Sequence, residues 1–316
     1  MGAPRHALLL TAGFGSRLRP LTLVRAKPAI PVAGEPLARR IVRWLVANGV
    51  TDLVANLHHL PATMTAALGD CSDLGARLRY SWEQPIILGS AGGPRRALSI
   101  VGADTFLMVN GDTLVDVDLS AVAAAHALSG ALATLALVPN GDPLRYGGVR
   151  LDDGGAVLGF VQRGPAAAGS FHFVGVQVVE AAAFRSLPEG RAASSIGGTY
   201  DELIAARPGS IRGFVSEAVF LDIGTIADYW RTSFAIAGSP DVRGWQGRNV
   251  RLDDGARVNR SIVWDNVRIG AGSSLDECIV TDGVHVPAGA AYRRTILLKT
   301  GSGVAATPFA VQEKIS

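Results

Sequence analysis

The sequence contains little cysteine and no long apolar run. Cys71 and Cys278 are the only cysteines among 316 residues, and two cysteines so far apart indicate neither a disulfide framework nor a zinc site. The most apolar stretch, residues 121–138, is mostly alanine and contains His126 and Ser129. We expect a helix followed by a buried strand there rather than a membrane span. These absences favour a reducing, cytoplasmic compartment and predict no membrane partner.

The chain also has little excess of positive over negative charge. The formal net charge is only +3 and the cations form no run, so we expect no nucleic-acid partner. The apolar run at residues 7–10 is too short for a secretory signal. Apolar residues make up 48% of the chain and charged residues 18%, which is typical of a folded globular protein. A chain of this length is expected to form two domains.

Helical and strand-like patterns alternate through the first 240 residues. In residues 36–49, apolar side chains recur every three or four positions and Gly49 ends the pattern. Strands that alternate with helices predict parallel β-α-β units. We therefore predict the α/β class, with a mostly parallel, Rossmann-like sheet and helices on both faces. The expected strands are residues 7–12, 50–57, 78–82, 105–109, 134–139, 148–151, 157–162, 171–179 and 219–222, and the expected helices are 36–49, 62–68, 92–100, 200–206 and 226–237.

The last part of the chain has a different pattern, a 17-residue repeat. Residues 249–265, 266–282 and 283–299 align, with small or apolar residues at steps of six, six and five. Three short strands per repeat, with inward side chains stacked on the next repeat, indicate a parallel β-helix. We predict domains at residues 1–240 and 241–316, with the break near Ser239 and Pro240. The positions expected to point inward are 250, 256, 262, 267, 273, 279, 284, 290 and 296.

Two further expectations concern the repeat. Trp245, Trp264 and Tyr292 are expected to pack it. A short β-helix leaves strand edges open at its ends, so we expect the protein to form a homo-oligomer.

The turn after the first strand carries the clearest chemical signal. Gly13 and Gly15 end the strand, and Arg17 and Lys27 follow. A strand that stops at a glycine turn leaves backbone N–H groups able to hold phosphate oxygens, and cations just beyond them imply a ligand with several phosphates. A dinucleotide-binding turn would need a third glycine where Leu18 stands, and a P-loop would need Gly-Lys followed by Ser or Thr. The chain is therefore expected to bind a nucleoside triphosphate.

A second polar turn lies at an equivalent place. Asn110-Gly111-Asp112 follows the apolar strand at residues 105–109. Ligands of open α/β sheets gather at the carboxyl ends of the strands. We therefore expect this turn and the Gly13 turn to belong to one site.

Five motifs, in this order, give the chain a resemblance to a known family. They resemble those of the sugar-1-phosphate nucleotidyltransferases over roughly residues 7–238, and a left-handed β-helix is a common appendage of the same enzymes. The layout is similar to that of mannose-1-phosphate guanylyltransferases. The motifs are residues 13–22 with 26–28, residues 84–85 with 88–93, and residues 109–112, 146–149 and 221–225.

The resemblance implies a reaction and a role for each matching residue. An oxygen of the sugar-1-phosphate would attack the α-phosphorus of the triphosphate, and pyrophosphate would leave. Arg17 would bind the departing pyrophosphate, and Lys27 would hold phosphates at the reacting centre. Asp112 and Asp222 would share a Mg²⁺ ion, with Asp112 counted among the catalytic residues. The implied nucleotide-binding residues are Ala12, Gly13, Gly15, Gln84 (for the base edge), Gly89, Ser90 and Ala91. The implied sugar-phosphate residues are Gly147, Gln162, Arg163 and Gly175.

Two departures from the family pattern concern the sugar pocket. Gln162-Arg163 stands where the family usually has Glu-Lys, and Phe173 stands where it tends to have Asn. Arg163 keeps a cation, but as a larger planar fork. We favour GTP and mannose-1-phosphate as substrates. UTP- or TTP-dependent transfer and a non-catalytic regulatory subunit of the same fold stay open. A β-helix acyltransferase is disfavoured, because three coils are few and His285 is the only obvious catalytic histidine of the tail.

Overall fold

The computed structural model describes residues 2–236, 244–301 and 303–310. By internal packing, the chain forms two compact units, Met1–Phe14 with Ala38–Leu221, and Gly15–Leu37 with Asp222–Ser316. The segment after the first strand thus packs with the C-terminal part of the chain, which the sequence did not predict. The predicted domain boundary near Ser239 and Pro240 lies outside the described residues and stays a prediction.

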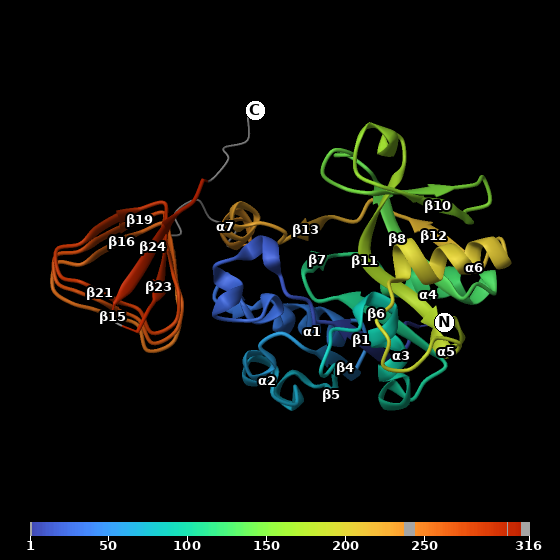
Figure 1. Cartoon of the computed structure of the whole chain (residues 1–316), viewed down its shortest axis with the longest axis horizontal. Coiled ribbons are helices and arrows are strands. Elements are labelled where there is room, and N and C mark those ends of the chain that lie inside the picture. Colours follow the sequence, from blue (N-terminus) through green and yellow to red (C-terminus); the bar gives the residue numbers. More distant parts are fainter. Residues whose placement is uncertain (1, 237–243, 302, 311–316) are drawn as a thin grey trace. The chain divides into compact units, whose positions relative to one another are not determined.

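The first unit is built on a sheet with a parallel centre (Figure 1). β1 pairs in parallel with β4 on one side and β6 on the other, and β4 pairs in parallel with β5. The run Ala7-Leu8-Leu9 of β1 is completely buried, as expected for a strand covered on both faces. The predicted α/β class with a mostly parallel sheet is confirmed. In the described part of the chain, nine strands join this sheet: β1 (His6–Leu10), β4 (Asp52–Leu57), β5 (Arg77–Trp82), β6 (Thr105–Asn110), β8 (Ala133–Pro139), β9 (Gly148–Leu151), β10 (Val157–Val161), β11 (Phe171–Glu180) and β12 (Ile211–Val215).

Antiparallel strands extend the sheet beyond β6. β11 runs antiparallel to β6 and to β8, and β9 runs antiparallel to β10. The pairing of β11 with β8 shifts register between Phe173 and Gln177, and Gly175 lies in this shift with a φ of 83°. The sequence did not predict β12 or the short strand β7 (Thr113–Val115), whereas it did predict β13 (Phe220–Asp222).

The helices begin at positions set by local hydrogen bonds. The Asp118 carboxylate accepts the N–H groups of Ser120 and Ala121 at the start of α4, and Thr225 and Asp228 form a reciprocal capping box at the start of α7. The helix and strand expected in residues 121–138 are α4 and β8. No described helix combines the length and the apolar character needed to cross a membrane. The α-helices are α1 (Leu37–Ala47), α2 (Pro61–Leu68), α3 (Gly89–Val101), α4 (Leu119–Ser129), α5 (Ala182–Arg185), α6 (Tyr200–Ala206) and α7 (Ile226–Ala235).

The second unit contains a segment of short turns, residues 15–37, which we call the turn segment. Its regular elements are three one-turn 3-10 helices and a two-residue ladder between β2 and β3. Such one-turn pieces have poorer hydrogen-bond geometry than α-helices, so their position also depends on what they pack against. The elements are the 3-10 turns Ser16–Leu18, Leu21–Leu23 and Lys27–Ala29, and the strands β2 (Pro31–Val32) and β3 (Glu35–Pro36).

The 17-residue repeat forms the predicted parallel β-helix. Residues that pair along its three sheets differ by 17 in number, as in Arg251, Arg268 and His285, or in Val258, Leu275 and Tyr292. Each coil turns at left-handed residues that recur with the same period, such as Gly255, Gly272 and Gly289. The strands are β14 (Gly244–Gln246), β15 (Arg251–Leu252), β16 (Arg257–Asn259), β17 (Ser261–Val263), β18 (Arg268–Ile269), β19 (Ser274–Asp276), β20 (Ile279–Val280), β21 (His285–Val286), β22 (Ala291–Arg293), β23 (Thr295–Lys299) and β24 (Val304–Pro308).

One set of inward positions was predicted wrongly. Val263, Val280 and Leu297 belong to the core cluster of the coil, and adjacent side chains of a strand point to opposite faces. The neighbouring residues 262, 279 and 296, all isoleucine, therefore face outward, although they are also buried. Helix α7 contacts the residues that flank this sheet. Trp264 Nε1 donates a hydrogen bond to the Tyr229 hydroxyl of α7, and the Arg260 guanidinium lies over the Trp230 ring of α7. The sheet is therefore buried on both faces.

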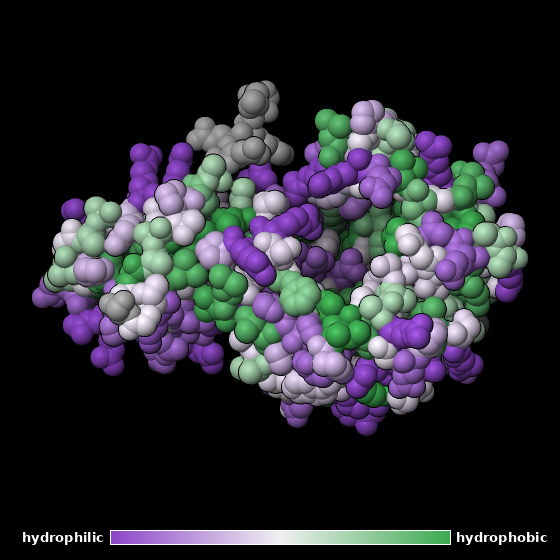
Figure 2. Space-filling view, viewed as in Figure 1, coloured by the Kyte–Doolittle hydropathy of each residue, from purple (hydrophilic) through white to green (hydrophobic). Residues whose placement is uncertain are grey.

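The coil has one strand edge that the chain itself covers. β24 runs antiparallel along β23 and pairs with it over five residues, which satisfies the edge of the last coil in this sheet. Tyr292 packs against the coil core as expected, whereas Trp245 bonds the carbonyl oxygen of Ser233 on α7. Hydrophilic side chains line the margins of the coil (Figure 2). Arg251 and Arg268 are exposed side chains of the coil.

Replacing Leu275 by alanine should destabilise the coil. Leu275 is completely buried in its core, and a buried Leu→Ala change costs about 2–5 kcal/mol. The control is Leu252→Ala, since Leu252 is 46% exposed and should lose less than half as much. Urea unfolding followed by tryptophan fluorescence measures both variants. Equal losses would contradict the assignment of Leu275 to the core.

Candidate active site

A buried chain of hydrogen bonds joins the carboxyl ends of three strands in the first unit. The backbone N–H of Thr11, after β1, donates to Asn56 Oδ1 on β4 at 2.6 Å. Asn56 Nδ2 donates in turn to Glu83 Oε1, after β5, at 2.6 Å. The other carboxylate oxygen of Glu83 accepts the backbone N–H of Leu88 at 2.6 Å, immediately before α3. This chain fixes the Gly13 turn and the start of α3 relative to each other.

Glu83 is the centre of this network, and sequence reasoning missed it. Its side chain is fully buried. Burial raises its pKa above the ordinary value of 4.5, although the hydrogen bonds from Leu88 and Asn56 oppose the rise. A side chain at Gly93 would collide with the carboxylate, so the glycine lets α3 lie directly against it. In the sequence, the feature that could have indicated Glu83 is its place directly before Gln84, a predicted nucleotide-binding residue.

The start of α3 is already capped by the protein. The carbonyl oxygen of Ala193 accepts the N–H groups of Ala91, at 2.9 Å, and Gly92, at 3.2 Å. Gly89 has a φ of 76°, and a Cβ there would lie 2.7 Å from the same oxygen. The Ser90 hydroxyl accepts the N–H of Ser195. Of the predicted nucleotide-binding residues, Ala91 therefore has its amide engaged by the protein, while Gly89 is exposed.

The other predicted nucleotide-binding residues of this unit lie at the ends of β1 and β5. Ala12 is buried and Gly13 is exposed, and no described residue apart from its two chain neighbours has an atom within 4 Å of a Cβ built on Gly13. Gln84 is exposed and follows the buried Glu83. The ring of Phe14 makes edge contacts with His58 and His59, at 5.4 and 5.6 Å between ring centroids.

Two of the predicted sugar-phosphate residues, Gly147 and Gly175, lie close to groups of other strands. A Cβ on Gly147 would lie 3.1 Å from the carbonyl oxygen of Val161, so Gly147 adjoins the exposed pair Gln162 and Arg163. A Cβ on Gly175 would lie 2.8 Å from the Asn110 amide nitrogen. The left-handed bulge at Gly175 thus lies against the turn that carries Asp112.

In the second unit, the turn segment folds back on itself around Gly15. Gly15 has a φ of 59°, and a Cβ there would lie 2.8 Å from Thr22 Cγ2 and 3.0 Å from Lys27 Cβ. Thr22 Oγ1 donates to the carbonyl oxygen of Gly15 at 3.1 Å. This closure brings Lys27, which is buried, beside the glycine turn.

Gly224 lies close to two predicted functional side chains. A Cβ built on it would lie 2.8 Å from Asp222 Oδ2 and 3.3 Å from Arg17 Nη1. The predicted pyrophosphate-binding cation and the second predicted metal ligand are therefore neighbours, although 205 positions separate them in the sequence. Sequence reasoning named both residues, but only the folded chain shows the glycine that makes room for them.

The carboxylates fit the implied metal by their chemistry. Mg²⁺ is usually held by one or two carboxylates, and waters and substrate phosphates complete its shell. Asp112 and Asp222, one from each unit, are both half-buried. No group of three or more His, Cys, Asp or Glu side chains in the described ranges is arranged to hold a metal. Each of the two aspartates offers carboxylate oxygens, which are the type of ligand that Mg²⁺ takes.

Comparison with known proteins gives the class. The model of the nucleotidyl transferase family matches residues 6–238, and that of the GlmU-like C-terminal hexapeptide matches residues 235–295. The chain belongs to the nucleotidyl transferase family, which confirms the resemblance in the motifs and the left-handed β-helix. The protein is thus an enzyme of this family.

Curated relatives agree with this assignment, and a solved structure shares the fold. The mannose-1-phosphate guanylyltransferase of Mycobacterium tuberculosis is 33% identical over 257 residues, which cover 80% of this chain and 71% of the relative. The UTP–glucose-1-phosphate uridylyltransferase of Synechocystis is 30% identical over 82% of this chain and 70% of its own length. The crystal structure of HddC from Yersinia pseudotuberculosis has a TM-score of 0.64 at 21% identity, over 73% of this chain and 98% of that chain; this likeness shows the fold.

Replacing Gly224 by alanine should lower activity while the fold survives. The added methyl group must displace the Asp222 carboxylate or the Arg17 guanidinium, both mobile ends of side chains, and a displacement of about 1 Å costs up to roughly 100-fold in rate. We expect kcat/KM for pyrophosphate release to fall about 10- to 100-fold. Gly301→Ala, where a Cβ meets open space, is the control. Full activity in Gly224→Ala would show that catalysis does not need this arrangement.

Replacing Glu83 by glutamine should change how stability depends on pH. Because the folded state raises the pKa of Glu83, its contribution to stability is complete below pH 4.5 and is lost as the pH rises through the raised value. Glutamine cannot ionise, so the excess stability of the wild type over Glu83→Gln should shrink as the pH rises from 4.5. Urea unfolding between pH 4.5 and 7.5 measures this difference. Glu189→Gln, at an exposed side chain, should show no such trend, and an excess that grows with pH would contradict the assignment.

Proposed function

We propose that the protein makes a nucleotide-sugar from GTP and mannose-1-phosphate. A phosphate oxygen of the sugar-1-phosphate attacks the α-phosphorus, and the bond from the α-phosphorus to the bridging oxygen breaks. Pyrophosphate leaves with that oxygen, and the nucleotide-sugar retains the α-phosphate. Such transfers depend on positioning and on neutralising the charge of the leaving group.

The observation that carries the choice of substrates is the match to a guanylyltransferase. The relative from M. tuberculosis carries that name, and the match covers 80% of this chain. The uridylyltransferase from Synechocystis, which matches over a similar share, makes UTP with glucose-1-phosphate the second pair to test.

The roles of the triphosphate-binding residues follow from their chemistry. Arg17 offers a planar, permanently charged fork for the departing pyrophosphate, and Lys27 offers a compact charge for phosphate oxygens near the reacting phosphorus. Gly13 and Gly89 are exposed glycines that allow the nucleotide to approach the backbone. Ala12, Gly15 and Ser90 shape this surface, Ala91 packs beneath it, and Gln84 reads the base edge.

Mg²⁺ is the proposed cofactor. Asp112 and Asp222 would hold it, and when bound it would neutralise charge on the phosphate oxygens. The chain's own contribution is to keep the two carboxylates in place, through the turn after β6 for Asp112 and through Gly224 for Asp222.

The sugar-1-phosphate is proposed to use Gly147, Gln162, Arg163 and Gly175. Arg163 can bind the phosphate of the acceptor in a bidentate manner, and Gln162 can hydrogen-bond sugar hydroxyls through its amide. We further propose that the enzyme works in the cytoplasm as a homo-oligomer, in which the open strand edges at the ends of the coil are covered.

Pyrophosphate release tests the proposal directly. Purified full-length protein with Mg²⁺ should release pyrophosphate from GTP and mannose-1-phosphate faster than from any other pair of GTP, UTP, TTP or ATP with mannose-, glucose- or N-acetylglucosamine-1-phosphate. Greater activity with UTP and glucose-1-phosphate would overturn the choice of substrates. No release with any pair would overturn the catalytic function and favour a regulatory subunit.

The same assay applies to Asp112→Asn. Removing one carboxylate charge from the proposed metal site should lower activity by roughly 100-fold or more, without loss of the folded state by circular dichroism. Asp153→Asn, in an exposed turn, should keep full activity. Retained turnover in Asp112→Asn would remove Asp112 from the metal site.

A further inference from the structure

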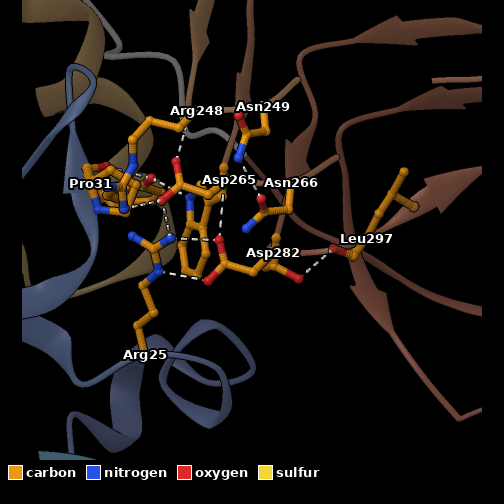
Figure 3. A network of polar contacts seen from close by, with 11 residues as sticks. Arg25, Pro31, Arg248, Asn249, Asp265, Asn266, Asp282 and Leu297 are labelled. Atoms are coloured by element: carbon orange, nitrogen blue, oxygen red, sulfur yellow. Dashed lines mark hydrogen bonds and ion pairs between the residues drawn. The ribbon is translucent and has the colours of Figure 1, made fainter. Parts of the chain in front are cut away.

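The β-helix holds one side chain of the turn segment very firmly. The Arg25 guanidinium lies between two aspartates of the coil (Figure 3). Its Nε and Nη2 donate to the two carboxylate oxygens of Asp282, both at 2.6 Å, and Nη2 also reaches Asp265 Oδ2 at 2.9 Å. The guanidinium carbon lies 5.3 Å from the centre of the Trp264 ring. We call Arg25, Asp265 and Asp282 the coil anchor.

The coil itself orients the two carboxylates. Asp265 and Asp282 occupy the same position in successive coils, one strand spacing of about 4.8 Å apart. Asp265 Oδ1 accepts the N–H of Arg248 at 2.7 Å, and Asp282 Oδ1 accepts the N–H of Asp265 at 3.0 Å. Because two like charges so close together repel, a cation between them is strongly favoured. The 17-residue repeat therefore places two carboxylates so that together they bind one arginine.

The charges of the anchor are mutually stabilised. Burial opposes ionisation of Arg25, but the hydrogen bonds and charges of Asp282 and Asp265 outweigh it and raise the pKa of Arg25. Burial likewise opposes the charged form of Asp265, yet its contacts with Arg248 and Arg25 lower its pKa. A lysine could supply the charge but not the fork that spans both oxygens of Asp282.

A second contact ties the turn segment to the same corner of the coil. Trp264 Nε1 donates to the Tyr229 hydroxyl at 3.0 Å, and that hydroxyl donates to the carbonyl oxygen of Pro31 at 2.8 Å. Lys27 lies in the sequence between the two tied residues, Arg25 and Pro31. The segment that carries Arg17 and Lys27 is thus fastened on both sides of Lys27 to residues 264, 265 and 282.

We propose that Arg25 is a positioning residue, through which the β-helix holds the turn segment in the conformation that presents Arg17 and Lys27 to the triphosphate. The inference rests on the proposed function for its catalytic consequence. The β-helix then contributes to catalysis through the position of these two cations, beyond any part in assembly. The one-turn 3-10 helices of the segment have poorer hydrogen-bond geometry than α-helices, and the anchor adds a constraint on the segment from outside these turns.

Hydrogen exchange on the full-length chain tests the anchor without any substrate. The reporters are the amides of Leu18, Leu23 and Val24, which are hydrogen-bonded within the turn segment. In Asp282→Asn they should exchange at least about tenfold faster than in the wild type. The matched control is Asp253→Asn, which removes the ion pair with Arg268 at 3.0 Å elsewhere on the coil and should leave these amides unchanged. Equal exchange in the two variants would overturn the proposal.

Arg25→Lys provides a second variant that leaves the hydrogen bonds of the coil in place. It too should speed exchange of the reporter amides, while exchange of the coil strands stays at the wild-type rate. If Asp282→Asn disrupts the coil itself, Arg25→Lys decides the question. Unchanged exchange in the turn segment of Arg25→Lys would then overturn the anchor.

Kinetics separate positioning from a general structural effect. With GTP and mannose-1-phosphate, Arg25→Lys should lower kcat about tenfold and leave the KM for the sugar-1-phosphate within twofold, since the proposed acceptor residues lie outside the turn segment. Equal losses in both constants, or no loss, would overturn the positioning role. If the wild type releases no pyrophosphate, the proposed function fails, whereas the exchange experiment still supports or overturns the anchor.

Discussion

Parallel pairing of β1 with both β4 and β6 is the constraint on which the first unit's part of the site depends. It brings the carboxyl ends of the strands to one edge of the sheet. Thr11 follows β1, Asn56 lies on β4 and Asp112 follows β6, so their order along this edge is set by backbone hydrogen bonds. Glu83, after β5, then joins the strand ends to α3 through two short hydrogen bonds.

Close packing around glycines is the second general feature of the site. Gly15, Gly93 and Gly224 each lie where a side chain would meet another residue of the site. In the second unit, Gly15 lets the turn segment close on Lys27, and Gly224 admits both Asp222 and Arg17. These glycines are required by the folded protein, whereas Gly13 faces open space and is suited to contact with a ligand.

In the second unit, the regular repeat of the β-helix positions two aspartates that bind one arginine of the turn segment. The period of 17 places Asp265 and Asp282 in register, and the backbone of the coil aims both carboxylates. One arginine from the other end of the sequence completes the arrangement. A rigid scaffold that holds a segment of short turns is a common way to position polar groups.

Local pattern allowed much of the fold to be predicted. Examples are the apolar run of β1, the helical spacing of α1 and the 17-residue repeat. Each can be recognised from residues close in sequence, because the period of the apolar side chains differs between a helix and a strand. The same pattern misassigned Ile279, which lies beside the core residue Val280 and faces away from the coil interior, because burial on both faces hides the alternation of a strand. Motifs named Arg17, Asp112 and Asp222, but their precise roles stay predictions.

By itself, the sequence determined the α/β class, the β-helix and the family of enzymes, since these depend on periodicity and on motifs of consecutive residues. Tertiary structure alone decided that Glu83 links Asn56 to Leu88, that Ala193 caps α3, that Gly224 lies close to both Asp222 and Arg17, and that Arg25 binds the coil. Each of these contacts joins residues distant in the sequence or depends on the space between side chains. Such contacts have no local period, so only the folded chain reveals them.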